Sequence, residues 1–417
     1  MTALAPPRES MPIPASGINV FSLLLTYYWA LQFVMRTGDQ VQRGSVMYWL
    51  FVIPIALFSA LLLGAMGVAA RLNTPSWLVS VYAIVVSAVA LVRGDYQTLA
   101  STLLLCSALV VIFAGRLSPS VDFLNRLFLL SIALNSLLFL LGRTIYAVIP
   151  GFSTGGEFWW RVSAFPAVAT SAFFSLIVFF LNLRHRDAYL RKVCLVVSLY
   201  FVLFSGIRSA LIAGILAGGY MLLVRARFVK RTPTKVVYLF FAVIVLVSSL
   251  FLTQLLLTIP SFSSEGLNMY LFRSAEGLQS QEDAARAIYR TWLWSEHLRI
   301  ASQNPILGVG TFNFGLVSSI DPLFGANGSE AFLTGLYARV GVPAVLLVAA
   351  LLSAIVRGLE SNDDMHILVG LAMFVAMLAY GSFINAYDFV FLVMIGLLAA
   401  NKSTVAELPR QSAANTA

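Results

Sequence analysis

Apolar runs long enough to cross a lipid bilayer recur along most of the chain, and this feature restricts the fold most strongly. A helix needs roughly 20 predominantly apolar residues to cross ~30 Å of hydrocarbon. Because 59% of the 417 residues are hydrophobic and only 11% are charged, a soluble domain is excluded. We therefore predict an all-α, polytopic membrane protein of about 12 transmembrane helices. The runs lie at 18–35, 46–66, 77–92, 98–115, 127–142, 163–183, 193–207, 209–224, 236–257, 333–356, 366–383 and 388–400.

Basic residues indicate the orientation of these helices. Lysine and arginine favour the cytoplasmic side of a membrane, and two basic clusters, at 184–192 and 225–235, fall between consecutive runs. Both clusters face the cytoplasm if the two termini do, and this is the orientation that we predict. The net charge of +9 is thus explained by topology and does not indicate nucleic-acid binding. The polar N-terminal segment lacks a basic signal region, so we expect the first run to remain as a span.

The same orientation divides the chain around one large outer loop. Residues 1–257 form an N-terminal transmembrane region of about nine helices. Residues 258–332 form the outer loop, and residues 333–417 form about three further helices and a cytoplasmic tail. Residues 143–162 and the turn at Arg208 lie on the same outer face as the loop. These three segments are the predicted walls of a functional site.

No motif in the sequence indicates a metal ion or a nucleotide cofactor. Gly308-Val-Gly310 resembles a dinucleotide-binding loop only superficially, because it follows Asn-Pro rather than a strand. The two cysteines, Cys106 and Cys194, lie in or beside apolar runs, and we interpret them as core or lipid-facing side chains. We therefore expect neither a metal nor a cofactor.

Charged and aromatic residues gather in one segment of the outer loop, which we predict to be a helix. Glu282 to Ser302 carries acidic residues in its first turn and is followed by an Asn-Pro pair. Arg286, Arg290 and His297 fall on one face of this helix. The arginines either touch lipid phosphates from an interfacial helix or bind a substrate pyrophosphate. His297 is either a solvated side chain or a catalytic group.

Three residues elsewhere on the outer face are further candidates. Arg208 lies between two apolar runs, where arginine is costly and is usually paired or functional. Arg208 and Arg161 are either snorkelling side chains or phosphate ligands. Glu330 lies just before the run at 333–356, and it is either a general base or a cap for the helix that follows.

At these residues the sequence resembles the bacterial O-antigen ligase/polymerase superfamily, which includes Wzy-type polysaccharide polymerases. The resemblance covers residues 200–345 and implies a GT-C-like membrane glycosyltransferase of the bacterial inner membrane. Its substrates would be sugars linked to undecaprenyl diphosphate, and residues 258–332 would form a periplasmic loop. The matching motifs are Ser205-Gly-Ile-Arg208-Ser-Ala-Leu, Arg290-Thr-Trp-Leu-Trp, Asn304-Pro-Ile-Leu-Gly-Val-Gly-Thr-Phe-Asn-Phe, and Glu330 through Tyr337-Ala-Arg-Val-Gly341.

The resemblance also implies roles for the candidate residues. Arg208 and Arg290 match best the arginines that hold the diphosphate, and Arg161 and Arg286 are expected to assist them. With Glu330, Arg208 and Arg290 form the predicted catalytic set. The expected partners are the lipid-linked glycan and the lipid bilayer, with a chain-length regulator and a flippase as candidate protein partners.

One departure from the family pattern concerns the choice of acceptor. Ligases that transfer glycan to lipid A-core typically have a histidine at the position that Glu330 occupies, counted back from Gly341. We therefore predict a polymerase of O-antigen, capsule or exopolysaccharide repeat units at the periplasmic face. The alternatives are an O-antigen ligase and a transporter or flippase of a lipid-linked glycan.

Overall fold

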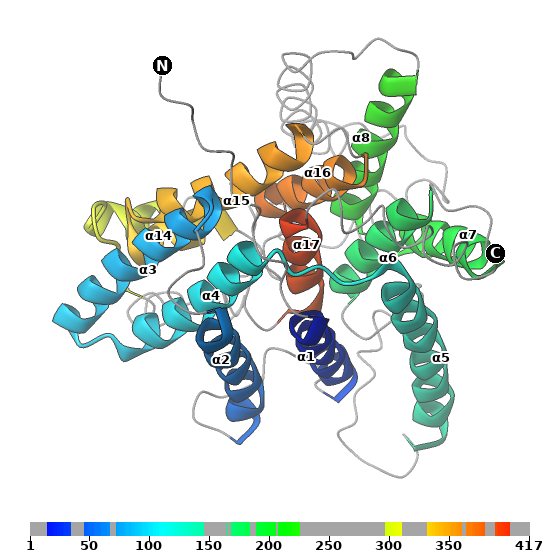
Figure 1. Cartoon of the computed structure of the whole chain (residues 1–417), viewed down its shortest axis with the longest axis horizontal. Coiled ribbons are helices and arrows are strands. Elements are labelled where there is room, and N and C mark those ends of the chain that lie inside the picture. Colours follow the sequence, from blue (N-terminus) through cyan, green and yellow to red (C-terminus); the bar gives the residue numbers. More distant parts are fainter. Residues whose placement is uncertain are drawn as a thin grey trace, which may run out of the picture.

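The regular structure in the described part of the chain is entirely helical, which confirms the all-α class for these residues (Figure 1). The protein is represented by a computed structural model. It describes residues 15–34, 46–66, 72–145, 164, 168–183, 189–205, 207–225, 297–310, 332–360, 364–379 and 388–400.

The helices follow the predicted apolar runs closely. In the N-terminal part they are α1 (Ala15–Val34), α2 (Val46–Met66), α3 (Thr74–Arg93), α4 (Tyr96–Gly115) and α5 (Val121–Ile145). They continue with α6 (Val168–Asn182), α7 (Tyr189–Phe204) and α8 (Arg208–Arg225). A short helical segment at 297–303 precedes α14 (Phe332–Val340), α15 (Ala344–Glu360), α16 (Asp364–Ala379) and α17 (Phe389–Ala399). The predicted run at 236–257 lies outside the described residues.

Two of the described helices, α3 and α4, are long and apolar enough to cross a membrane. Shorter apolar stretches lie in α1, α2, α6, α8, α15, α16 and α17. The side chains of Leu61 on α2 and Ile84 on α3 are 63% and 69% exposed. Large apolar side chains exposed in this way are expected on helices that face lipid. The total of about 12 spans stays a prediction.

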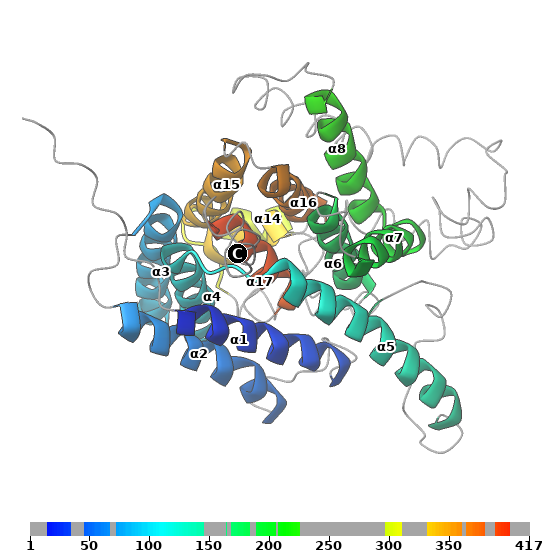
Figure 2. The ribbon, with the colours of Figure 1, turned by 45° about the vertical axis from the view of Figure 1, so that its right-hand side comes forward.

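The last of the described helices, α17, lies at the centre of the bundle (Figures 1 and 2). Every residue from Phe389 to Leu398 is buried, and α17 packs against α1, α4, α6, α15 and α16. The absence of a side chain at Gly396 allows the Phe21 ring to pack against α17, since a Cβ at Gly396 would lie 2.9 Å from that ring. Because lipid is as apolar as these side chains, close packing rather than removal from water stabilises such contacts in a membrane.

One predicted run is interrupted. The prediction of a continuous helix at 333–356 is wrong, because α14 ends at Val340 and α15 begins at Ala344. Gly341 has a φ of 68°, in the left-handed region that ends many helices. Pro343 then disfavours helical backbone at the residue before it. The outer end of this predicted span is therefore a separate short helix joined to α15 by a tight turn.

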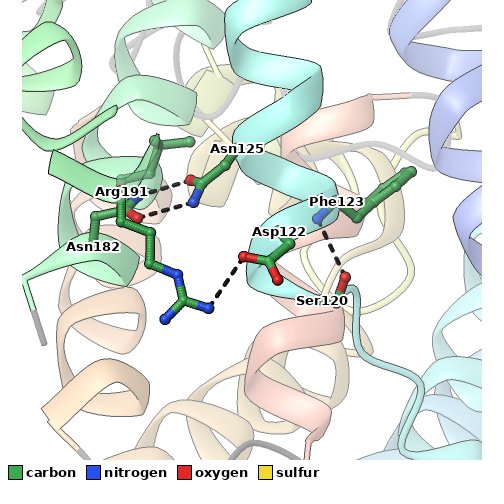
Figure 3. Close-up of polar contacts among 7 residues, drawn as sticks. Ser120, Asp122, Phe123, Asn125, Asn182 and Arg191 are labelled. Atoms are coloured by element: carbon green, nitrogen blue, oxygen red, sulfur yellow. Dashed lines mark hydrogen bonds and ion pairs between the residues drawn. The ribbon is translucent and has the colours of Figure 1, made fainter. Parts of the chain in front are cut away.

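Polar contacts join the start of α5 to the end of α6 and to the start of α7 (Figure 3). The buried amides of Asn125 and Asn182 exchange two hydrogen bonds of 2.9 and 2.8 Å. Beside them, Nη2 of Arg191 lies 3.1 Å from Oδ1 of Asp122. Since the end of α6 and the starts of α5 and α7 lie together, α6 runs antiparallel to α5 and α7. Consecutive membrane spans alternate in this way.

Candidate functional site

Most of the predicted site residues lie outside the described part of the chain. These are Arg161, Arg286, Arg290 and Glu330. Arg208 is the first residue of α8. The described segments next to these residues nevertheless show which parts of the chain meet.

A short turn precedes Arg208. Buried Ser205 holds this turn, because its Oγ accepts a 3.3 Å hydrogen bond from the backbone N–H of Ile207. The predicted runs at 193–207 and 209–224 are therefore two separate helices, since α7 ends at Phe204 and α8 begins at Arg208. Since so few residues connect α7 to α8, the start of α8 lies at the same end of the bundle as the end of α7.

The start of α6 lies at that same end, because α6 and α7 are antiparallel. There, the hydroxyl of Ser171 accepts a 2.7 Å hydrogen bond from the backbone N–H of Ala164. Ala164 follows Arg161 by three residues and is fully buried. The chain segments that carry Arg161 and Arg208 thus lead to one end of the α6–α8 group, in agreement with the predicted topology.

The helical segment at 297–303 is the C-terminal end of the helix predicted from Glu282 to Ser302. It ends where the Asn-Pro pair predicts. The side chain of Asn304 accepts a 3.3 Å hydrogen bond from the N–H of Leu307, and its carbonyl oxygen accepts one of 2.8 Å from Gly308. The end of this helix is confirmed, whereas its start lies outside the described residues.

His297, the first residue of this described segment, does not face solvent. Its side chain is 1% exposed, so the interpretation as a solvated side chain is wrong. The ring nitrogen Nδ1 lies 3.0 Å from the hydroxyl oxygen of Thr334 in the first turns of α14. A buried imidazole needs such a partner, because an unpaired buried polar group is costly. A catalytic role for His297 stays a prediction.

The contact between His297 and Thr334 joins two described segments that follow residues with predicted chemistry. His297 follows Arg290 by seven residues, and Thr334 follows Glu330 by four. The side chains of Arg290 and Glu330 are not placed by this contact. It does bring together the helical segment at 297–303, which follows the predicted arginines Arg286 and Arg290 in the sequence, and the first turns of α14.

A glycine junction, which we define as residues 306–310 together with Gly341, holds the other end of α14. The last carbonyl groups of a helix have no partner within the helix. Here the N–H groups of Val309 and Gly310 donate hydrogen bonds of 2.9 and 2.8 Å to the carbonyl oxygens of Ala338 and Arg339. The segment after the Asn-Pro pair therefore caps α14.

The junction needs glycine at three positions. Gly308, Gly310 and Gly341 all have positive φ angles, of 64°, 84° and 68°. A Cβ at Gly308 would lie 2.4 Å from the backbone of Arg339, and one at Gly341 would lie 2.4 Å from the carbonyl oxygen of Ile306. The Gly-Val-Gly sequence thus has a structural explanation in close backbone approach.

The turn between α3 and α4 receives the glycine junction. Arg93, in the last turn of α3, donates hydrogen bonds from Nη1 to the carbonyl oxygens of Gly308 at 2.8 Å and Leu307 at 3.1 Å. Asp95 lies on the other side of the turn, where its Oδ2 would be 2.4 Å from a Cβ added to Gly310. A small hollow here is lined by Arg93, Asp95, Gly310 and Arg339.

Sequence reasoning did not single out Arg93 or Asp95. The local signal was the pair of residue types, since glycine often ends a helix and aspartate often caps the next; in the structure Gly94 has a φ of 66° and Asp95 accepts a 3.0 Å hydrogen bond from the N–H of Thr98. Both features predict a tight turn. What this turn contacts more than 200 residues later depends on tertiary structure.

Among the described residues, no group of three or more histidine, cysteine, aspartate or glutamate side chains is placed to hold a metal ion. Cys106 and Cys194 are both buried, as predicted. The chemistry that the described part of this site offers is that of arginine guanidinium groups, backbone amides and a buried imidazole.

Comparison with known proteins gives one match. Residues 193–349 match a protein family described as O-antigen ligase. The matched range contains α7, α8, the 297–310 segment, α14 and the beginning of α15. Neither the curated proteins nor the solved structures include a significant match. The recognised resemblance is confirmed by the family match, which includes Arg208, Arg286, Arg290 and Glu330 of the predicted site.

Proposed function

We propose that this protein is a polysaccharide polymerase. Its residues 193–349 carry a region of the O-antigen ligase/polymerase superfamily, which supports a function of that general type. In this proposal it joins oligosaccharide repeat units of O-antigen, capsule or exopolysaccharide. Each unit is carried on undecaprenyl diphosphate, and the reaction takes place at the periplasmic face of the inner membrane.

The proposed reaction is a single displacement at an anomeric carbon. A hydroxyl group at the non-reducing end of one lipid-linked repeat attacks the anomeric carbon of the growing chain. A new carbon–oxygen bond forms as the bond to the diphosphate oxygen breaks, and undecaprenyl diphosphate leaves with the bonding electron pair. The hydroxyl proton passes to a base, for which we propose Glu330. Direct displacement inverts the anomeric centre.

The family match carries this proposal, because it contains most of the residues that the chemistry requires. Arg208, Arg286, Arg290 and Glu330 all lie within residues 193–349. Arginine stays charged and offers a planar set of donors that suits phosphate oxygens. Such groups stabilise the negative charge that develops on the departing diphosphate. Arg161 lies outside the matched range and has a supporting role in the proposal.

The arrangement of contacts supports the proposed topology. Asn125 and Asn182 meet at helix ends that are cytoplasmic in this topology. Arg93 and Gly308 meet where both segments are periplasmic. Each of these two contacts thus joins helix ends that the proposed topology places on the same side of the membrane. This agreement supports alternating spans, and the proposal that both termini are cytoplasmic rests on the distribution of basic residues.

The identity of residue 330 favours a polymerase over a ligase. A carboxylate can accept the proton of an attacking sugar hydroxyl. The contact of His297 with Thr334 joins the described segments that follow Arg290 and Glu330 in the sequence.

The test is an in-vitro reaction of the purified protein with its lipid-linked repeat unit, in the presence of a chelator. A ladder of lengthening products on a gel would establish a metal-independent polymerase. A single transfer to a lipid A-core acceptor would replace the proposal with a ligase. Movement of intact substrate across vesicles, without bond formation, would replace it with a transporter.

A further inference from the structure

We infer that Arg93 is a positioning residue for this reaction, which holds the glycine junction against the α3–α4 turn and thereby sets the position of α14, the helix that begins two residues after Glu330 in the sequence. The inference rests on the proposed function for its catalytic consequence. Its structural part stands on contacts among described residues alone. Arg93 touches neither Glu330 nor the arginines of the predicted site in any described contact.

The first step is the contact between Arg93 and the junction. One guanidinium nitrogen donates to two successive carbonyl oxygens, at 2.8 Å for Gly308 and 3.1 Å for Leu307. Hydrogen bonds from a charged donor are stronger than those between neutral groups. Two acceptors on adjacent residues fix the direction of the chain as well as its distance from α3.

The second step is the rigidity of the turn that carries Arg93. Gly94 donates to the carbonyl oxygen of Leu91 at 3.1 Å, and Asp95 donates to that of Ala90 at 2.9 Å. The carboxylate of Asp95 caps α4 by accepting hydrogen bonds from the backbone and the hydroxyl of Thr98. These hydrogen bonds restrain the backbone on both sides of Gly94, and they therefore restrain the position from which the Arg93 side chain extends.

The third step links the junction to α14. Val309 and Gly310 cap the C-terminal carbonyl groups of α14, and Val342 donates a 3.0 Å hydrogen bond back to Ile306. A shift of the junction must therefore move the end of α14 or break these bonds. In addition, α15 packs directly against α3. The helix after the α14–α15 turn therefore contacts the helix before the α3–α4 turn.

The last step concerns the proposed base. Only Ala331 separates Glu330 from the start of α14 at Phe332. Catalysis is sensitive to small displacements of a reacting group, and a shift of about 1 Å can cost roughly 100-fold in rate. Arg93 is thus expected to affect the rate of the chemical step more than the binding of the lipid diphosphate.

The experiment compares Arg93→Gln, Arg93→Lys and Arg126→Gln in the full-length protein. Arg126 is an exposed arginine on α5 and serves as the matched control. Hydrogen exchange of the peptide that contains Val309 and Gly310 is measured without substrate. The kcat and KM values are then measured with the lipid-linked repeat unit.

We expect Arg93→Gln to speed exchange at Val309 and Gly310 by about tenfold, since it removes charged hydrogen bonds to this segment. We expect kcat to fall about tenfold with KM within about twofold of the wild-type value. In Arg93→Lys the exchange rate and kcat should both stay close to the wild-type values, because the ammonium group can still donate to a carbonyl oxygen. Arg126→Gln should change neither.

Unchanged exchange in Arg93→Gln would overturn the inference, as would a rise in KM with kcat intact. Equal losses in Arg126→Gln would overturn it too, because they would show a general effect of removing an arginine. Absence of polymer from the wild-type protein would instead overturn the proposed function. The exchange rates separate these two failures, because they require no substrate.

Discussion

The imidazole nitrogen of His297 lies 3.0 Å from the hydroxyl oxygen of Thr334, and the histidine side chain is 1% exposed. This bond crosses from the end of the arginine-rich segment to the first turns of α14. Together with the glycine junction, it attaches α14 to the preceding segment at both of its ends. The short helix that follows Glu330 is therefore held by specific polar contacts rather than by apolar packing alone.

Replacing Thr334 by valine should destabilise the protein while preserving its shape. The substitution removes the hydroxyl that pairs with buried His297, and we expect a loss of about 1–3 kcal/mol in the free energy of unfolding. The melting temperature of the purified protein in detergent measures this effect. Thr74→Val is the control, because Thr74 is exposed. Equal melting temperatures for wild type and Thr334→Val would contradict the prediction.

Replacing Gly310 by alanine should disrupt the glycine junction. The new Cβ would meet Oδ2 of Asp95 at 2.4 Å, and the backbone φ of 84° is unfavourable for alanine. We expect a stability loss of at least about 1–2 kcal/mol, measured by thermal unfolding. Gly218→Ala is the matched control, since nothing lies within 4 Å of a Cβ there. Within α8 that change should be neutral or stabilising by up to about 1 kcal/mol.

The amide pair of Asn125 and Asn182 should show strong coupling. Changing either residue alone to leucine removes both hydrogen bonds between the two buried amides, although Asn182 keeps its bond to the carbonyl oxygen of Val178, and should cost about 1–3 kcal/mol. Changing both removes the unsatisfied groups and should recover part of that loss. A double-mutant cycle of thermal stability checks this expectation. Strict additivity of the two single losses would show that the pair does not act as a unit.

Replacing Arg290 by alanine should abolish polymer without lowering the amount of protein in the membrane. The proposed cause is loss of charge stabilisation on the departing diphosphate, for which we expect a rate loss of at least about 100-fold. Product length on gels and immunodetection of the protein are the two measurements. Arg126→Ala serves as the control and should leave polymer unchanged. Full-length polymer from Arg290→Ala would remove this residue from the proposed site.

Replacing Glu330 by glutamine should separate its two proposed roles. A general base lost in this way should lower kcat by about 100-fold or more with little change in KM. A helix cap should largely survive, because the glutamine oxygen still accepts a hydrogen bond. Steady-state kinetics together with the melting temperature distinguish the roles. Unchanged kcat together with an unchanged melting temperature would exclude the general-base role and leave Glu330 with capping alone.

The apolar runs predicted the positions of the helices well, because a helix that crosses a bilayer must be mostly apolar along about 20 residues. Residues 46–66, for example, were predicted as a run and form α2 with the same bounds. The interruption at 341–343 was missed, since Gly341 and Pro343 lie inside a stretch that remains apolar. Hydropathy does not register a break in backbone hydrogen bonding of this kind.

Contacts between distant segments were less accessible from the sequence. Burial of His297 depends on its packing beneath α14, which begins 35 residues later, so the helical face alone did not reveal it. Arg93 looked like an ordinary basic residue at the end of a span, and its acceptors are backbone carbonyl groups, which carry no signature in a sequence. By contrast, the Asn-Pro end of the helix at 297–303 depends on local rules and was predicted correctly.

The central position of α17 has a consequence for how the protein is made. A ribosome synthesises this helix after all the other described ones, so the helices that surround it are in the membrane before their common partner exists. The slot between α1, α4 and α6 must stay open, or be filled by lipid, until Phe389–Ala399 arrives. The described bundle is therefore complete only after α17 has been synthesised. A chain truncated before Phe389 would contain every predicted arginine and Glu330, yet lack the buried helix at the centre of the bundle.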